Sequence, residues 1–460
     1  MSMAARIDAA IGTPGALEAL YRAAMEAGEV EEFVAEIVRR HAFSPDDVLI
    51  AAWFHRLQPR LAQPMVSGTA APATGATSAR GVRRAQWALA LVLSGVLSLV
   101  YITLGSHSRP MVYLMFAWAP AAAALLLIFL RIGRSETLVR PGAPALRALR
   151  GRPLVAIAVL AALTLIAIGR ADGLADPTQV DRLTLIHLPA LAWLILGWAV
   201  LGADAAPHEV FAAVRKSIEA LITAGLFAGA GGALTLMTAE LFRAIGVELP
   251  DWVSRCFTFG GPGLIPVLAV ATVYDPDRTP STQRSDHGFA RIIFTTGRLF
   301  LPLTLVVLAT YLVAIPFRFM EPFRSREVLI TYNAMLFAVT GLLVAATPLR
   351  ENEVPGRAGS WVRRGIIAVA ACALLVSLYA MAAVVYRTAE GGLTVNRLTV
   401  IGWNTVNIAT LGLLLYRQSR DGPATWIESS HRAFRIGLMG YAGWTLFVLI
   451  GVPLLRLGAR

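Results

Sequence analysis

The sequence of 460 residues is short of charged side chains. They make up 15% of the chain, against 56% hydrophobic residues, whereas soluble domains carry roughly 25% charged residues. The shortage is concentrated in apolar runs of about 20 residues, the length that a helix needs to cross a bilayer core of roughly 30 Å. The composition therefore predicts an integral membrane protein and argues against an ordinary soluble enzyme.

Cysteine and lysine are almost absent. The two cysteines, Cys256 and Cys372, lie in separate apolar runs, which gives neither a disulfide framework nor a metal site of recognisable spacing. We therefore expect no metal and no cofactor. The single lysine, Lys216, lacks the preceding glycines of a phosphate-binding loop. The H-E-x-x-H and G-x-S-x-G motifs of familiar soluble enzymes are missing as well.

A cleavable signal peptide and a clustered basic patch are also missing. The first apolar run, residues 48–54, follows Asp46 and Asp47 with no basic segment directly before it, so we expect the N-terminus to stay in the cytoplasm. The net charge of +12 comes from basic residues spread between the apolar runs. Binders of nucleic acids gather such residues on one face or in a tail, so no nucleic-acid partner is expected.

Three regions are predicted along the chain. Residues 1–60 form a cytoplasmic helical region, because apolar residues recur there at helical spacing; it is either a small docking unit or a loosely folded extension. Residues 61–85 form a flexible linker, rich in Ala, Thr, Ser, Gly and Pro, that ends in arginines. Residues 86–457 form the membrane domain. The predicted fold class is all-α, a polytopic transmembrane helix bundle with a small soluble helical region at its N-terminus.

About eleven spans are expected, each close to the length that a bilayer requires. They lie near 86–105, 111–130, 153–169, 183–202, 218–240, 256–274, 299–317, 328–348, 365–386, 398–416 and 436–455. The loops alternate in their excess of arginine, and basic loops favour the inside. This predicts a cytoplasmic N-terminus and, for an odd number of spans, a periplasmic C-terminus. The preference for arginine over lysine suggests a GC-rich bacterial gene, and hence a bacterial inner membrane protein in contact with membrane lipids.

Polar side chains inside the spans are the first candidates for a functional site, because burying them in lipid is costly. Five are placed in the outer halves of the spans: His187, Glu240, Asn333, Asn404 and Asn407. Together they would line an outward-facing polar cavity. Alternatively, the His and Asn side chains bridge helices by hydrogen bonds, and Glu240 pairs with an arginine one turn along its helix.

A run of glycine and proline within one span is the second candidate. Gly260, Gly261, Pro262 and Gly263 predict a broken or kinked helix. Broken helices form binding sites in many transporters, because freed backbone groups bind a substrate or an ion. The alternative is an ordinary turn near the outer end of the span.

The C-terminal half carries motifs of a known family. The segment 297–303, the later Tyr311, and Arg387 followed by Gly392-Leu393-Thr394 and Arg397 resemble a bacterial family of polytopic membrane proteins, the domain of unknown function four-one-five-three. The resemblance covers residues 86–457, is specific around 297–311 and 387–397, and implies no activity.

The residues of this motif can also be interpreted without the family. Residues 391–394 predict a tight turn after a helix that ends at Arg387, with Thr394 or Asn396 capping the next helix. Arg397 would lie at the outer membrane surface. Its role is structural, or it contacts an anion or a lipid head group.

Three functions follow as hypotheses. The first is transport, as in a permease, and a continuous polar cavity would favour it. The second is an integral membrane enzyme that acts on a lipid-linked substrate with Glu240 or His187 as acid or base, and a one-sided pocket open to lipid would favour it. The third is a signalling or scaffold protein whose N-terminal helices bind a cytoplasmic protein partner.

Overall fold

The computed structural model describes most of the chain. The described residues are 3–10, 14–27, 29–43, 47–61, 74–104, 110–139, 147–171, 179–244, 246, 250–283, 288–324 and 326–457. Within them the regular structure is helical throughout, without a strand, so the prediction of an all-α fold is confirmed. The chain divides into two compact units, Met1–Ala76 and Thr77–Arg460.

The N-terminal unit is a packed group of four helices. They are α1 (Met3–Ala10), α2 (Pro14–Ala27), α3 (Val30–Phe43) and α4 (Val48–Leu61). At its centre the rings of Tyr21, Phe33 and Trp53 contact one another at centroid distances of 5.3–5.5 Å. Such aromatic contacts strengthen a small core beyond the area that they bury. This part of the chain is therefore a folded unit with its own core.

The predicted linker is partly helical. Residues 62–73 lie outside the described residues, but α5 begins at Thr74 and runs to Leu104, so residues 74–85 belong to a helix. No proline occurs after Pro72 in this segment, and extending an existing apolar helix by further turns is easier than starting a new one. The expectation of a flexible chain up to residue 85 is corrected accordingly.

The second unit consists of long apolar helices. Among the described residues, ten helices are long and apolar enough to cross a membrane. The shorter apolar stretch Trp118–Ile132 corresponds to the one remaining predicted span, 111–130. The long helices are α5, α6 (Pro110–Ile132), α9 (Arg152–Ala171), α10 (Gln179–Leu201), α11 (Pro207–Ala244), α13 (Gly261–Val273), α14 (Gly288–Ala314), α16 (Arg326–Ala346), α17 (Arg357–Gly391), α18 (Val395–Arg420) and α19 (Trp426–Leu446). This is a multi-pass membrane protein.

Short helical segments connect or extend these helices. They are α7 (Ser135–Val139), α12 (Asp251–Arg255), η1 (Cys256–Gly260), η2 (Pro280–Thr282), η3 (Ile315–Arg318), α15 (Glu321–Arg324), η4 (Glu351–Glu353), η5 (Phe447–Gly451) and α20 (Val452–Leu457).

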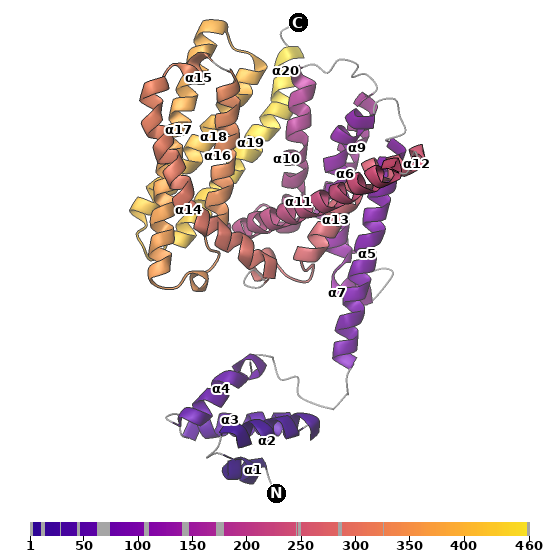
Figure 1. Ribbon diagram of the computed structural model, residues 1–460, viewed down its shortest axis with the longest axis vertical. Coiled ribbons are helices and arrows are strands. Elements are labelled where there is room, and N and C mark those ends of the chain that lie inside the picture. Colours follow the sequence, from indigo (N-terminus) through magenta and orange to yellow (C-terminus); the bar gives the residue numbers. More distant parts are fainter. Residues whose placement is uncertain are drawn as a thin grey trace. The chain divides into compact units, whose positions relative to one another are not determined.

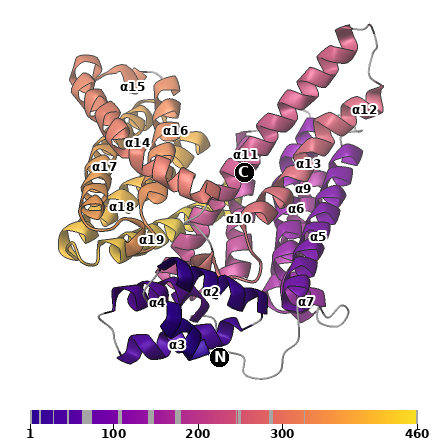
Figure 2. The ribbon, with the colours of Figure 1, turned by 60° about the horizontal axis from the view of Figure 1, so that its bottom comes forward.

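The long helices form two groups. In the first, α6 packs on α9, α10 and α13, and α5 also lies here; in the second, α17 packs on α14, α16 and α18, and α18 packs on α19. Helix α11 contacts both groups, through α13 on one side and α16 and α19 on the other. Figure 2 shows α11 running obliquely past the more parallel helices of the two groups. The two groups thus meet along α10, α11 and α19.

The connections between helices lie at two opposite ends of this unit. The segment with α7 and the loops that hold η2 and η4 are joined by hydrogen bonds: Asp277 accepts from Ser135, and Arg350 donates to the Ser281 carbonyl. We call this end the basic face, because Arg131, Arg134, Arg150, Arg152 and Arg350 surround it. The other end, with α15 and α20, is the opposite face (Figure 1).

The glycine and proline run does not interrupt its helix. Residues Cys256–Gly260 form a π-helical turn that continues directly into α13, and Gly260 and Gly261 both have right-handed helical φ and ψ. Gly263 packs on the backbone of Ser98, where an added Cβ would lie 2.4 Å from the Ser98 Cα, and the Ser98 Oγ donates to the Gly260 carbonyl at 2.9 Å. The expected broken helix is corrected: small residues here let α5 approach.

Candidate functional site

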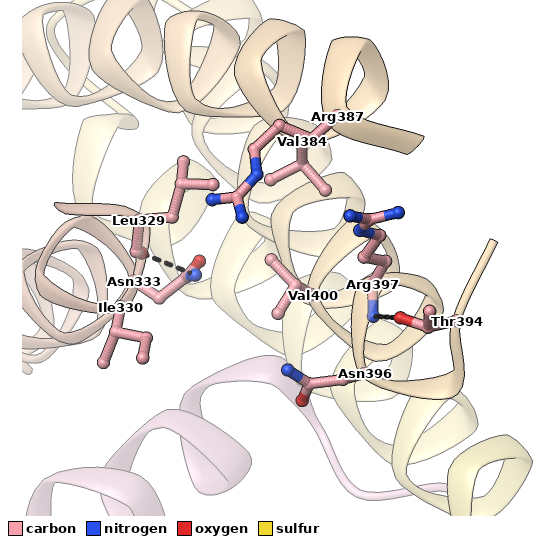
Figure 3. A pocket seen from close by; sticks show the side chains of 9 residues that line it. All are labelled: Leu329, Ile330, Asn333, Val384, Arg387, Thr394, Asn396, Arg397 and Val400. Carbon is pink, nitrogen blue, oxygen red and sulfur yellow. Dashed lines mark hydrogen bonds between the residues drawn. The ribbon is translucent and has the colours of Figure 1, made fainter. Parts of the chain in front are cut away.

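The clearest polar site lies at the opposite face, between α16, α17 and α18. It is a pocket of about 230 Å³, which we call the arginine pocket. Its polar lining residues are Asn333, Arg387, Thr394, Asn396 and Arg397, and its apolar ones are Leu329, Ile330, Val384 and Val400. Figure 3 shows the guanidinium group of Arg387 above Asn333 and, on the other side of Val384 in this view, that of Arg397. The structure thus brings together Asn333 and the family-like turn, which sequence analysis treated separately.

The turn between α17 and α18 fixes Arg397. Gly392 has a positive φ of 74°, a conformation that favours glycine, and the Arg397 Nη1 donates to the Gly392 carbonyl at 2.5 Å. The Thr394 Oγ1 accepts from the Arg397 backbone N–H at 3.3 Å, so the predicted cap by Thr394 is confirmed. Leu393 is exposed. Helix α17 extends to Gly391 rather than ending at Arg387, which places Arg387 on the helix, facing the pocket.

The charges of the arginine pocket are not balanced within it. The Arg387 Nη1 is buried and has no hydrogen-bond partner among the described residues, and the same holds for the Asn333 Oδ1. The Asn333 Nδ2 donates to the Leu329 carbonyl at 2.9 Å. Among the described residues that line the pocket, none carries a carboxylate. Two cations therefore share one cavity without a counter-charge from its walls.

A larger cavity lies between the two helix groups. Its volume is about 660 Å³, within the range of roughly 300–1,000 Å³ that is usual for ligand sites. Its walls come from α6, α10, α11 and α13 on one side and α16, α18 and α19 on the other, and they are almost entirely apolar. Of the described residues that line this apolar cavity, only Arg435 is charged.

Aromatic rings line the part of the apolar cavity that is nearest the arginine pocket. Trp403 contacts His187 at 5.4 Å, Phe337 at 5.2 Å and Tyr441 at 5.3 Å between ring centroids. The Trp403 Nε1–H donates to the His187 Nε2 at 2.9 Å, and this bond joins α10 to α18 across the two groups. The Tyr441 hydroxyl donates to the Asn407 Oδ1. We call these four rings the aromatic cluster.

The same helix faces line both cavities. On α16, Asn333 lines the arginine pocket and Phe337 the apolar cavity; on α18, Val400 lines the first and Trp403 the second. Residues three or four apart lie on one face of a helix, about one turn from each other. The aromatic cluster therefore separates a cationic pocket from an apolar cavity along one seam.

The remaining intramembrane candidates take different places. The His187 Nδ1 lies 2.8 Å from the Leu183 carbonyl. If it carries the proton, both ring nitrogens are satisfied and His187 has none left for catalysis. Asn404 is fully buried, and neither of its amide atoms has a partner. Glu240 lies apart on α11, is exposed, and pairs with Arg243 at 2.5 Å. The five residues thus do not line one polar cavity.

A buried ion network joins the two groups at the basic face. Arg215 of α11 donates two hydrogen bonds to Glu353, at 2.9 and 3.1 Å, and Arg298 of α14 donates a third at 2.6 Å. Beside it Lys216 pairs with Glu219 at 2.7 Å. Burial by itself raises the pKa of Glu353, but the charge of Arg215 and the hydrogen bonds from both arginines outweigh this, so its pKa lies below the ordinary 4.5.

This network was not predicted from the sequence. Its members are up to 138 residues apart, and the predicted span began at residue 218, which left Arg215 and Lys216 in a loop. A usable signal was the presence of three charged residues within five positions at the start of an apolar run. Aromatic rings also join α11 to α19 near the network: Phe211 stacks on His431 at 4.1 Å and on Phe434 at 5.7 Å between centroids.

Comparisons with protein-family models, curated proteins and solved structures gave no match. A search of the described residues for three or more His, Cys, Asp and Glu side chains that could hold a metal ion found no such group.

Proposed function

We propose that this protein is a permease-like membrane protein that carries a hydrophobic or amphipathic substrate, such as a membrane lipid, through the apolar cavity. The observation that supports this proposal most directly is the cavity of about 660 Å³ between two helix groups. A cavity between two groups of helices matches a transporter, in which one group moves against the other around a central site.

The walls of the cavity favour an apolar substrate over a polar solute. Its lining includes Ala192, Leu196, Val214, Val344 and Leu438, and desolvating a polar solute against such residues is costly. The Trp193 indole N–H is already used in a hydrogen bond to Ser217, and the Thr340 hydroxyl, which donates to the Leu336 carbonyl, keeps only its capacity to accept a hydrogen bond. No Asp, Glu or His is among the described lining residues, which leaves the enzyme hypothesis without an acid or base in this cavity.

The two ends of the cavity are suited to act as gates. Toward the opposite face, the aromatic cluster and the bond between His187 and Trp403 hold the groups together. Toward the basic face, the stack of Phe211 on His431 and the pair of Arg215 with Glu353 do the same. Opening one end while the other stays closed would give alternating access.

Orientation and family membership belong to the same proposal. We infer a cytoplasmic basic face in a bacterial inner membrane, from the arginines of its loops, which places α20 and the arginine pocket at the periplasmic side. Membership of the domain family four-one-five-three rests on residues 297–311 and 387–397. The N-terminal unit is proposed to bind a cytoplasmic protein.

A substitution that fills the cavity tests this function. Gly341 lines the cavity, and nothing lies within 4 Å of a Cβ built on it, so Gly341→Phe places a ring in open space. In vesicles that contain the protein, a phospholipid with a fluorescent acyl chain should exchange between leaflets faster than in empty vesicles. With Gly341→Phe this excess rate should be lost.

The matched control is Gly443→Phe, because Gly443 is exposed, has the same open surroundings and does not line the cavity. Its exchange rate should equal that of the wild type. Transport is contradicted if the wild type exchanges lipid no faster than empty vesicles do. A role for the cavity is contradicted if both variants retain the wild-type rate.

A further inference from the structure

We propose that the arginine pocket is a binding site for an oxyanion of the phosphate type, presented at the opposite face. The site does not depend on the proposed transport, because it is formed by residues other than those of the apolar cavity. Its specific ligands are the guanidinium groups of Arg387 and Arg397, with the side chains of Asn333 and Asn396 at its border.

The positive charge of the arginine pocket is not compensated by the described residues that line it. A buried donor without a partner destabilises the folded protein, and two cations in one cavity also repel each other. The Arg387 Nη1 is such a donor, and the side chain of Arg387 makes no hydrogen bond or ion pair within the described part of the chain. An anion between Arg387 and Arg397 would remove both unfavourable effects together.

The arrangement of the two guanidinium groups also favours an oxyanion. A guanidinium group presents a planar set of N–H donors that matches the oxygens of a phosphate or carboxylate. Arg397 is held by its bond to the Gly392 carbonyl, and its guanidinium group lies close to Gly391, where an added Cβ would be 2.9 Å from Nη1 and Nη2. Arg387 comes from α17 and Arg397 from α18, so two helices each contribute one guanidinium group to the lining of the pocket (Figure 3).

The N-terminal end of α18 favours an anion at the same place. Thr394 caps this helix by accepting from Arg397 N–H, which leaves the first backbone N–H groups of the helix, at Val395 and Asn396, without a partner inside it. The N-terminal end of a helix carries a partial positive charge that favours anions. The pocket therefore combines two arginines, a helix start and a volume of about 230 Å³, which is small for a drug-sized ligand and sufficient for a phosphate group.

A phosphate group can reach this pocket as a free ion or as part of a lipid head group. We would measure two kinds of binding on the purified full chain. The first is the affinity for inorganic phosphate in a maltoside detergent, by isothermal titration. The second is binding of phosphatidylglycerol: the protein is placed in phosphatidylcholine vesicles that also contain phosphatidylglycerol, and native mass spectrometry measures how much phosphatidylglycerol stays bound to the protein. Each is measured for the wild type, Arg387→Gln, Arg397→Gln and Arg318→Gln.

Arg318→Gln is the matched control. Arg318 is exposed at the same face, lies outside the pocket and makes no ion pair in the described residues, so this variant loses the same charge without changing the site. Arg387→Gln and Arg397→Gln should weaken binding about tenfold or more, as expected for a lost charge-assisted hydrogen bond. Arg318→Gln should bind as the wild type does. Arg387→Lys, which keeps the charge, should recover part of the affinity.

The two binding measurements distinguish the two sources of the phosphate group. Binding of free phosphate with this pattern supports a soluble oxyanion, and retention of phosphatidylglycerol alone with the same pattern supports a head group. The proposal is overturned if the wild type binds neither, or if Arg318→Gln weakens binding as much as Arg387→Gln does. Gly341→Phe should leave phosphate binding unchanged, so that failure of the transport proposal can be told apart from failure of this one.

Discussion

The arginines at the two ends of the membrane unit have opposite surroundings. At the basic face, Arg215 and Arg298 share the carboxylate of Glu353 through three hydrogen bonds. At the opposite face, Arg387 and Arg397 share a pocket without a carboxylate among its described lining residues. The same residue type is therefore neutralised by the protein itself at one end and left for an external partner at the other.

This difference separates a structural role from a ligand-binding one. A buried charge with its counter-ion and hydrogen bonds holds elements together, and removing one partner leaves the other buried and unpaired. A cation whose donor has no partner contributes little to folding and is available for binding. The contrast leads to predictions of different size for the two ends.

The largest effect is expected for Glu353→Gln. The substitution leaves Arg215, whose exposed fraction is 2%, without the carboxylate that accepts its hydrogen bonds, and breaking a buried ion pair in this way typically costs about 3–5 kcal/mol of stability. Denaturant unfolding in detergent micelles would measure this loss. Glu428→Gln, at an exposed pair with Arg432, is the control and should unfold as the wild type does. A Glu353→Gln variant of wild-type stability would show that the network does not hold the two groups together.

The same network predicts a dependence on acid. Because the pKa of folded Glu353 lies below 4.5, its stabilising contribution is complete above that value and is lost as the pH falls through the folded pKa. The melting temperature of the wild type should therefore decline below about pH 4.5. The Glu353→Gln variant should decline less over the same range. Parallel pH profiles for the two proteins would contradict this assignment.

At the opposite face, Arg387→Gln should not destabilise the protein in the absence of an anion. Removal of a half-buried donor without a partner is expected to raise the free energy of unfolding by about 1 kcal/mol. Denaturant unfolding in phosphate-free detergent is the measurement, and Arg363→Gln is the comparison, because Arg363 donates two hydrogen bonds to Gln418 and should lose stability. A loss for Arg387→Gln as large as that for Arg363→Gln would assign Arg387 a structural role.

The smallest effect is expected for Glu240→Gln. Glu240 is exposed and pairs only with the exposed Arg243, and ion pairs of this kind contribute little. Lipid exchange in vesicles and unfolding should both match the wild type. Loss of exchange at normal stability would instead indicate a proton- or cation-handling carboxylate.

The membrane helices could be predicted from the sequence, but the ion pairs that join them could not. The lengths of the apolar runs predict spans because the bilayer imposes that length on every helix. Helix α11 extends well beyond its prediction: the predicted span 218–240 is part of a helix of 38 residues. Its first turns contain Arg215 and Lys216, and their burial depends on Glu353 and Glu219. An apolarity pattern contains no information about a partner in a distant loop.

The candidate site could be predicted only in part, for a similar reason. The turn at Gly392 and the cap by Thr394 follow from local preferences and were predictable. Asn333 lies on another helix, and its place beside Arg387 depends on how α16 packs against α17. The grouping of His187 with Glu240 relied on equal depth alone. Depth does not fix the direction of a side chain around its helix, and Glu240 lies on an exposed part of α11.

The ion network also has a consequence for the order in which the protein is made. Arg215 is synthesised 138 residues before Glu353. At a translation rate of about 5–20 residues per second, this separation corresponds to roughly 7–28 seconds. During that interval the start of α11 has no carboxylate for Arg215 from the second helix group. The first helix group is therefore incomplete during that interval, and a chain that stops before residue 353 would lack the carboxylate to which the buried Arg215 donates two hydrogen bonds.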